Sequence, residues 1–175
     1  MIIVISGLRG VGKTSLALKL LVELKGRCIR CGGVLTLGQD RRYFFRVQDQ
    51  AQIPFEKPGD HNPVRVGKYA IAQSALEFAN EAIRYGATQE VLLIDEIGTL
   101  ESRRKGLFNA TAAALASPNA VKILVVRQDV LNHIESLFGV QYDHCLTIEY
   151  RNWEKFVAPL VDTVIGAIQR INLND

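Results

Sequence analysis

A glycine-rich run near the amino terminus is the first segment whose residue types and spacing could do chemistry. Residues 7–14 follow the pattern G-x-x-x-x-G-K-[ST], between an apolar run and a helical pattern. Glycines let the backbone wrap around an anion with its N–H groups pointing inward, and the helix that follows adds the positive end of its dipole. In such a loop the positively charged ammonium group of Lys13 contacts the β- and γ-phosphates, and the Thr14 hydroxyl binds Mg²⁺. The alternative is a glycine-rich turn without a ligand.

This pattern, the P-loop, predicts that the segment binds the phosphates of a nucleoside triphosphate such as ATP or GTP, with Mg²⁺ as cofactor. The phosphate-binding residues predicted in this way are Gly7, Leu8, Arg9, Gly10, Val11, Gly12, Lys13, Thr14 and Ser15.

Two neighbouring carboxylates follow a second apolar run at residues 91–94. We expect Asp95 to hold Mg²⁺, directly or through water, because this hard cation prefers oxygen ligands. Glu96, next to it, is placed to orient and deprotonate an attacking water. The alternative for Glu96 is a solvated carboxylate at the end of a strand.

An arginine after a third apolar run could complete the site. In the class of P-loop proteins that the Asp95–Glu96 pair resembles, the strand after the carboxylates lies between the first strand and the carboxylate strand. Here that strand is residues 121–126, so Arg127 would face the γ-phosphate. A surface arginine is the alternative, and Arg9, Arg103 and Arg104 compete for the role. The catalytic residues predicted on this basis are Lys13, Glu96 and Arg127.

Short apolar runs and helical patterns alternate along the chain, which predicts an α/β fold. The expected strands are 2–6, 34–37, 91–94, 121–126 and 145–148, and the expected helices are 14–25, 71–84 and 106–116. Runs rich in Ile, Val and Leu are typical of strands covered on both faces. We therefore expect a three-layer fold with a mostly parallel sheet and helices on both faces.

Two further segments depart from this alternation. A stripe from Phe156 to Ile168 predicts a last helix packed on the core, with Pro159 breaking or kinking its first part. Residues 38–68 are polar and contain an alternating run at 43–47, which predicts one or two β-hairpins and a long loop inserted in the fold.

Composition limits the remaining classes. A chain of 175 residues without an abrupt compositional boundary predicts one domain over 1–175. The net charge of +3 is too mild to indicate nucleic acid as a partner. No apolar run approaches the roughly 18 residues that span a membrane, and no basic segment precedes the first one, so we expect a cytoplasmic protein.

Three cysteines argue against a disulfide framework. The pair Cys28 and Cys31 resembles half of a zinc site, with His144 and Cys145 as further ligands. No second C-x-x-C or H-x-x-x-H unit supports this interpretation, and buried or strand-edge thiols are the alternative.

Beyond these motifs, several segments resemble, in order, the cancer-related nucleoside-triphosphatase family. The matching segments are 10–14, 32–36, 41–42, 65–69, 95–101 and 151–152, with Leu100 where the family commonly has Met. The resemblance implies slow, Mg²⁺-dependent hydrolysis of ATP, GTP, CTP and UTP with little base selectivity, on a RecA-like sheet. It also implies that residues 65–69 lie near the active site and that Arg151 approaches the base or ribose.

Three functions remain open from the residues themselves. The first is a nucleoside-triphosphate hydrolase in which Glu96 activates water. The second is a small-molecule, nucleoside or nucleotide kinase, with residues 38–68 as an acceptor-binding lid and Glu96 as base for a hydroxyl group. The third is a nucleotide-dependent switch or accessory protein with an unknown protein partner. Coupling of the P-loop to Asp95 and Glu96, together with the resemblance, favours the hydrolase.

Overall fold

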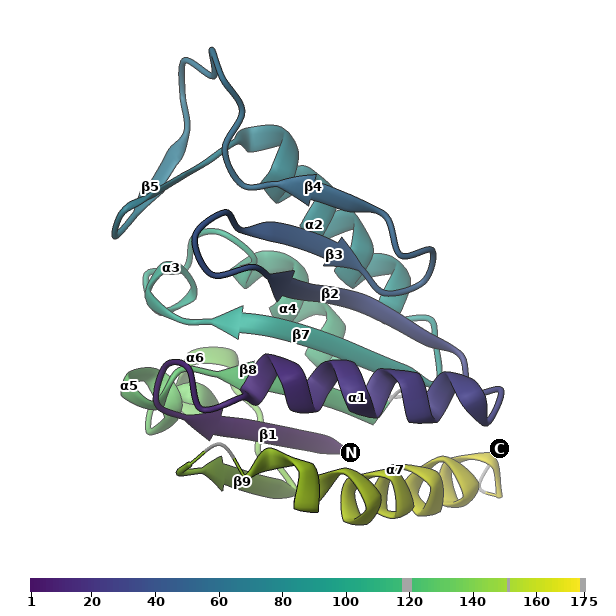
Figure 1. The fold of residues 1–175 in the computed structure, drawn as a ribbon. Helices are drawn as coiled ribbons and strands as arrows, with labels where there is room; N and C mark the ends of the chain where they lie inside the picture. The colour runs from purple at the N-terminus through teal and green to yellow at the C-terminus, as the bar shows by residue number, and fades with distance from the viewer. Residues whose placement is uncertain (118–120, 151, 174–175) are drawn as a thin grey trace.

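The computed structural model describes residues 1–117, 121–150 and 152–173, and its centre is a seven-stranded sheet (Figure 1). The strand order is β4-β3-β2-β7-β8-β1-β9. In chain order these strands are β1 (Ile2–Gly7), β2 (Cys31–Leu37), β3 (Tyr43–Arg46), β4 (Gln52–Pro54), β7 (Val91–Ile97), β8 (Val121–Val126) and β9 (His144–Ile148). The five strands from β2 to β9 in this order are parallel, and β3 and β4 extend the sheet as antiparallel edge strands.

Strand β8 lies between β7 and β1, as the Asp95–Glu96 pair predicted. All parallel strands end at the same edge of the sheet, so the P-loop after β1, the carboxylates of β7 and Arg127 after β8 share one edge. The parallel α/β fold predicted from the sequence is therefore confirmed.

Helices cover both faces of this sheet (Figure 1). They are α1 (Lys13–Gly26), α2 (Gln73–Gly86), α3 (Thr99–Ser102), α4 (Phe108–Ala116), α5 (Gln128–Leu131), α6 (Ile134–Phe138), the 3₁₀ turn η1 (Trp153–Phe156) and α7 (Val157–Asn172). Alternate residues of β1 divide between two cores: Ile3 and Ile5 pack with residues of α1 and α7, while Ile2 and Val4 pack with residues of α2 and α4. This arrangement explains the continuous apolar strands, because both faces are buried.

Strand β2 begins at Cys31, three residues before the predicted start at 34. Gly32 and Gly33, which the prediction left out of the strand, allow a close approach. A Cβ on Gly32 would lie 2.6 Å from Gly86 Cα in α2, and Gly33 has φ +113° with Leu93 O at 2.0 Å from its Cβ position. Small residues at this contact let helix α2 pack directly on the strand.

Two predicted helix boundaries and one predicted break were wrong. Ile71 belongs to strand β6, so α2 begins only at Gln73, and α4 begins at Phe108 rather than 106. Pro159 does not break α7, because it lies in the first turn. The N–H groups of a first turn have no intrahelical partner, so a proline there removes no hydrogen bond.

The inserted region contains two hairpins, as predicted. Strands β3 and β4 form the first, and β5 (Val64–Val66) pairs with β6 (Tyr69–Ile71) as a separate two-stranded sheet. The second hairpin stands off the main sheet, near the end that carries the P-loop (Figure 1). Within the described residues, no helix has the length and apolar character that crossing a membrane requires.

Candidate active site

The P-loop connects β1 to α1 and is shaped by three glycines with positive φ. Gly7, Gly10 and Gly12 have φ of 143°, 82° and 106°. Lys13 turns back over the loop, and its Nζ donates to the carbonyl oxygens of Gly7 and Leu8, each at 2.8 Å. Burial lowers the pKa of Lys13, while the nearby carboxylates oppose the shift. The ammonium is thus held inside the loop, where an anion would compete for it.

Asp95 lies at the centre of the site and joins three elements. Its Oδ2 accepts from the Thr14 hydroxyl at 2.8 Å and from the Thr36 N–H at 3.2 Å, and its Oδ1 accepts from the Glu96 N–H at 2.8 Å. The residue is 2% exposed. Burial, followed by the charge of Glu96, raises the pKa of Asp95 to about 6 in spite of these hydrogen bonds. The charge of Asp95 is therefore not fully compensated by the groups around it.

Thr14 and Asp95 fit a divalent cation. Both offer hard oxygen atoms, they are already in contact, and the raised pKa of Asp95 shows that an added positive charge would relieve an unfavourable burial. Two protein oxygens leave coordination positions for phosphates and water, which is the arrangement that Mg²⁺ favours.

Glu96 has an unusual backbone that aims its side chain. The pairing of β7 with β8 shifts register between Ile94 and Ile97, and Glu96 within this bulge has φ 73°. A left-handed conformation is costly for a residue with a Cβ and is found at functional sites. The Glu96 carboxylate forms an ion pair with Nη2 of Arg42, from the turn before β3.

The structure brings Arg127 to the same edge of the sheet but pairs it elsewhere. Its guanidinium donates to both carboxylate oxygens of Asp129, at 3.0 and 2.8 Å. Its aliphatic part lies against Gly98, where a Cβ would be 2.6 Å from Arg127 Cδ. Its charge lowers the pKa of Lys13, so the two groups are neighbours. Its role at the γ-phosphate stays a prediction.

The other arginines named from the sequence differ in whether they contact the P-loop region. Arg9 donates to the Tyr69 hydroxyl at 3.4 Å, so one end of the 65–69 segment does reach the P-loop. Arg104 contacts an aromatic ring instead, with its guanidinium 5.7 Å from the centre of the Phe108 ring. Arg151 lies outside the described residues.

Four residues of this region were not selected as site residues from the sequence. Arg42 pairs with Glu96, and the Thr36 amide binds Asp95. Trp153 packs on the P-loop so closely that a Cβ on Gly12 would lie 2.1 Å from its Cδ1. Buried Glu101 accepts from the N–H groups of Gly98 and Leu107, both at 3.0 Å, and ties down the segment after Glu96. A polar Thr36 inside an apolar strand was the clearest signal available.

The cysteines cannot gather at one zinc ion with His144. Strands β7, β8 and β1 separate Cys31 on β2 from Cys145 on β9, a distance of about 19 Å at the usual strand spacing. Burial raises the pKa of the Cys31 thiol to about 12, which disfavours the thiolate that a metal needs.

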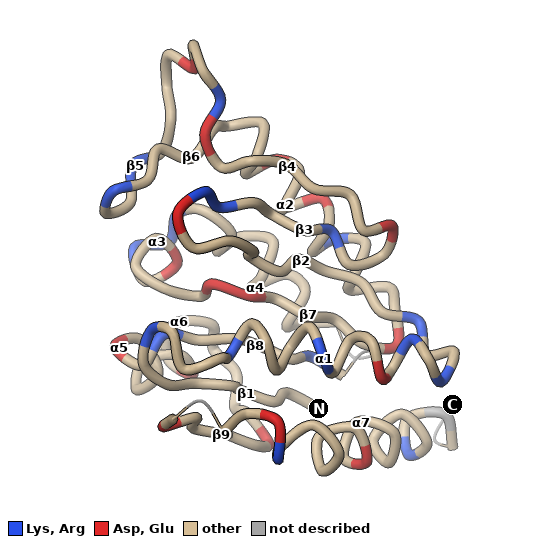
Figure 2. Tube along the Cα trace, in the orientation of Figure 1, with Lys and Arg blue, Asp and Glu red and all other residues tan. Residues whose placement is uncertain are grey.

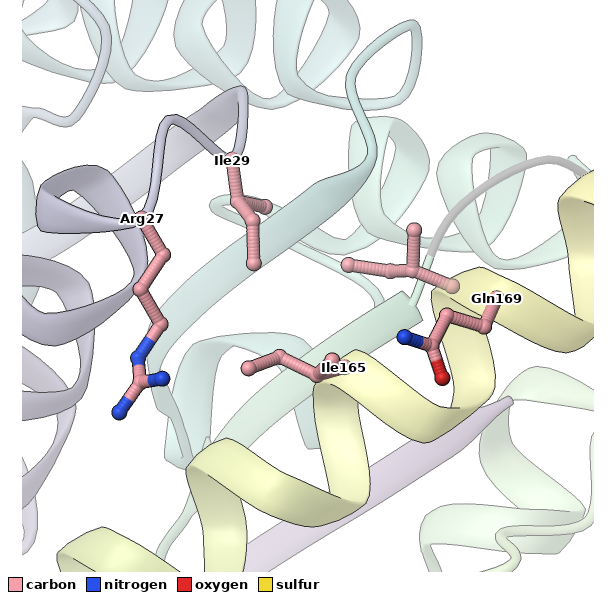
Figure 3. Close-up of a pocket in the computed structure, with 5 residues that line it drawn as sticks. Arg27, Ile29, Ile165 and Gln169 are labelled. Carbon is pink, nitrogen blue, oxygen red and sulfur yellow. The ribbon is translucent and has the colours of Figure 1, made fainter.

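An apolar groove of about 260 Å³ lies away from the P-loop (Figure 3). Its lining residues, from the segment between α1 and β2 and from the second half of α7, are Arg27, Ile29, Ile165, Ile168 and Gln169.

Comparisons with known proteins agree with this geometry. A sequence model of the family described as NTPase matches residues 2–160. The nucleoside-triphosphatase THEP1 of Pyrobaculum calidifontis is 36% identical over 107 residues, which are 58% of this chain and 59% of that protein. The THEP1 protein of Methanocaldococcus jannaschii is 26% identical over 175 residues, covering 95% and 99%.

The solution structure of a human cancer-related nucleoside triphosphatase has the same fold, with a TM-score of 0.71 at 20% identity over 93% of this chain and 96% of that one. Because the family model spans most of the sequence, this chain belongs to the NTPase family, as the ordered motifs predicted.

Proposed function

We propose that this NTPase splits a Mg²⁺-bound nucleoside triphosphate into diphosphate and phosphate, with Glu96 as the base that activates water, and that it accepts ATP, GTP, CTP and UTP. The observation that carries the proposal is the direct link from the P-loop through Thr14 to Asp95 and its neighbour Glu96. This link supports a site in which phosphate binding, cation binding and a base share one edge of the sheet.

Lys13 and the loop amides bind the phosphates. The Lys13 ammonium donates to two loop carbonyls, both 2.8 Å away. Phosphate oxygens carry more negative charge than carbonyl oxygens, so they draw the ammonium away from these contacts. The helix α1 begins at Lys13 and directs its free N–H groups toward the same anion.

Thr14 and Asp95 hold the cation. When bound, a divalent cation withdraws charge from the phosphate oxygens and so stabilises the transition state. The Thr36 and Glu96 amides keep the Asp95 carboxylate in place for this task. They orient the ligand in the way that outer-shell hydrogen bonds do at other metal sites.

Glu96 takes the proton of the attacking water. As the water oxygen bonds to the γ-phosphorus, the bond from phosphorus to the β–γ bridging oxygen breaks, and the electron pair leaves with the diphosphate. The proton passes to the Glu96 carboxylate and from there to solvent or to the phosphate product. The bulge at Glu96 supports this role, because it points the carboxylate away from the regular strand pattern.

Broad base acceptance follows from where the assigned groups act. Lys13, Thr14, Asp95 and Glu96 all serve the triphosphate or water, which the four nucleotides share. The proposal also places the chain in the cytoplasm, since Cys28 and Cys145 are exposed free thiols that suit a reducing compartment.

Phosphate release from ATP, GTP, CTP and UTP, with Mg²⁺ or with EDTA and without any acceptor, tests the reaction. We expect comparable Mg²⁺-dependent turnover with all four. Glu96→Gln should bind the nucleotide normally but lose most hydrolysis, whereas the control Glu23→Gln, on the side of α1, should behave as the parent.

Turnover of Glu96→Gln at the parent rate would remove Glu96 from the mechanism. Negligible phosphate release, with diphosphate and a phosphorylated product formed only when a nucleoside or other alcohol is added, would instead identify a kinase. Slow release with retained diphosphate, accelerated by a second protein, would identify a switch.

A further inference from the structure

We propose that Arg42 is the arginine that serves the γ-phosphate: it pairs with Glu96 in this structure and turns to the phosphate when a triphosphate binds. Glu96 is then free to accept a proton from water. This inference rests on the proposed function of the same site.

The position of Arg42 supports the assignment. Its backbone is anchored by a hydrogen bond from the Phe55 N–H to its carbonyl oxygen at 2.9 Å. Its side chain, only 18% exposed, crosses from the turn before β3 to the Glu96 carboxylate on β7. Because Glu96 directly follows Asp95, the Arg42 guanidinium contacts the residue next to the proposed cation ligand. Figure 2 shows basic positions on this β2–β3 turn, at the same end of the sheet as the P-loop.

Aromatic rings hold the guanidinium without tying it to a second carboxylate. The Arg42 Cζ atom lies 5.8 Å from the centre of the Phe55 ring and 5.3 Å from that of Tyr69. Stacking on aromatic faces keeps an arginine charged and partly removed from water, which strengthens its action on a nearby anion. These faces allow the guanidinium to turn in its plane.

The same rings connect Arg42 to the nucleotide loop. The Tyr69 hydroxyl donates to the Gln39 carbonyl at 3.1 Å and accepts from Arg9 of the P-loop at 3.4 Å. A nucleotide that displaces Arg9 therefore also disturbs the ring on which Arg42 rests.

Arg42 also has unused hydrogen-bonding capacity. Its Nε is buried and has no partner among the described residues, while Nη2 is occupied by Glu96. A buried donor without a partner is unfavourable. A phosphate group offers several acceptor oxygens in the geometry that the guanidinium fork matches, so it can satisfy donors that one carboxylate contact leaves open.

The competing arginines are already placed differently. Arg127 makes two bonds to Asp129, Arg9 donates to Tyr69, and Arg104 lies over Phe108. Among the described residues, the contact with the Glu96 side chain comes from Arg42. It is thus the arginine whose movement would change both the base and the charge at the phosphate.

This exchange would make the site respond to the third phosphate. A γ-phosphate carries more charge than the Glu96 carboxylate and competes for the guanidinium, whereas a diphosphate has no γ-phosphate and cannot compete in this way. Arg42 would then contribute to the binding of triphosphates but not of diphosphates, and its largest contribution would come in the transition state.

The test compares Arg42→Ala and Arg42→Lys with Arg41→Ala, which removes an equal charge from the exposed neighbour in the same turn. We expect Arg42→Ala to lower kcat about 10³-fold, in the range known for arginines at a γ-phosphate. It should weaken binding of a non-hydrolysable triphosphate analogue while leaving diphosphate binding unchanged. Added guanidinium ion should restore part of the rate. The kcat of Arg42→Lys should fall between those of the parent and Arg42→Ala. The kcat of Arg41→Ala should match that of the parent.

Two results would overturn the proposal. A rise in kcat of Arg42→Ala would mean that the residue only restrains Glu96. Equal weakening of triphosphate and diphosphate binding, without guanidinium rescue, would mean a structural role. Circular dichroism checks folding, and Arg42→Lys carries the test if the alanine variant does not fold. The binding comparison needs no turnover, so it is separate from a failure of the proposed hydrolysis.

Discussion

Replacing Asp95 with asparagine should stabilise the ligand-free chain above pH 6. The carboxyl is 2% exposed, and burial, followed by the charge of Glu96, raises its pKa from an ordinary 3.8 to about 6. The folded chain therefore binds this proton more tightly than the unfolded chain. Keeping Asp95 ionised costs folding free energy, and this cost is fully present above pH 6 and is lost as the pH falls toward 4.

The size of the effect follows from the two pKa values. A difference of roughly two units corresponds to about 3 kcal/mol at pH 8 and to less than about 1 kcal/mol at pH 4. Asparagine removes the charge but leaves one acceptor oxygen for the donors from Thr14, Thr36 and Glu96. A buried donor that loses its acceptor costs about 1–3 kcal/mol, so a net gain of up to about 2 kcal/mol remains at pH 8.

For a chain of 175 residues, that gain raises Tm by up to about 4–8 °C at pH 8 and leaves it nearly unchanged or slightly lower at pH 4. Thermal unfolding of both chains at the two pH values measures it, with the exposed Asp162→Asn as control. Mg²⁺ with a triphosphate should then stabilise the parent much more than Asp95→Asn. The quantity compared is the Tm of Asp95→Asn minus the Tm of the parent. If this difference is lower at pH 8 than at pH 4, the reasoning about the buried charge is refuted.

Three further substitutions test the loop and its support. Lys13→Ala should weaken triphosphate binding at least about 10-fold, because it removes a charge-assisted contact; titration with a fluorescent nucleotide measures this, and unchanged affinity would contradict the assignment. Gly12→Ala should lose about 2 kcal/mol or more, because φ is +106° and the new Cβ would lie 2.1 Å from Trp153; Tm and the emission of this single tryptophan report it, whereas Gly26→Ala, with open space around it, should not lose stability. Glu101→Gln should lower stability by about 1–3 kcal/mol, since one of two buried amide donors loses its acceptor; an unchanged midpoint in urea would argue against it.

Local patterns in the sequence were enough for the elements of the sheet. Runs such as 121–126 are apolar throughout because both faces of the strand are buried, and the structure has this strand with the same bounds. The boundaries failed where a local rule met a tertiary contact. Gly32 and Gly33 were left outside the predicted strand, yet they lie within β2, where their small size admits the close approach of Gly86. Pro159 suggested a break, yet its place in the first turn makes it harmless.

The sequence by itself determined the P-loop and the pair Asp95–Glu96, because each is a contiguous segment whose chemistry follows from its residue types. It also predicted that β8 would separate β7 from β1, and this brings the two segments to one edge. What only the tertiary structure decided is which distant side chains meet them. Arg42 reaches Glu96 across 54 positions of sequence, and Trp153 lies against Gly12. These contacts depend on strand order, on the bulge at Glu96 and on where the hairpins turn, so no local pattern encodes them.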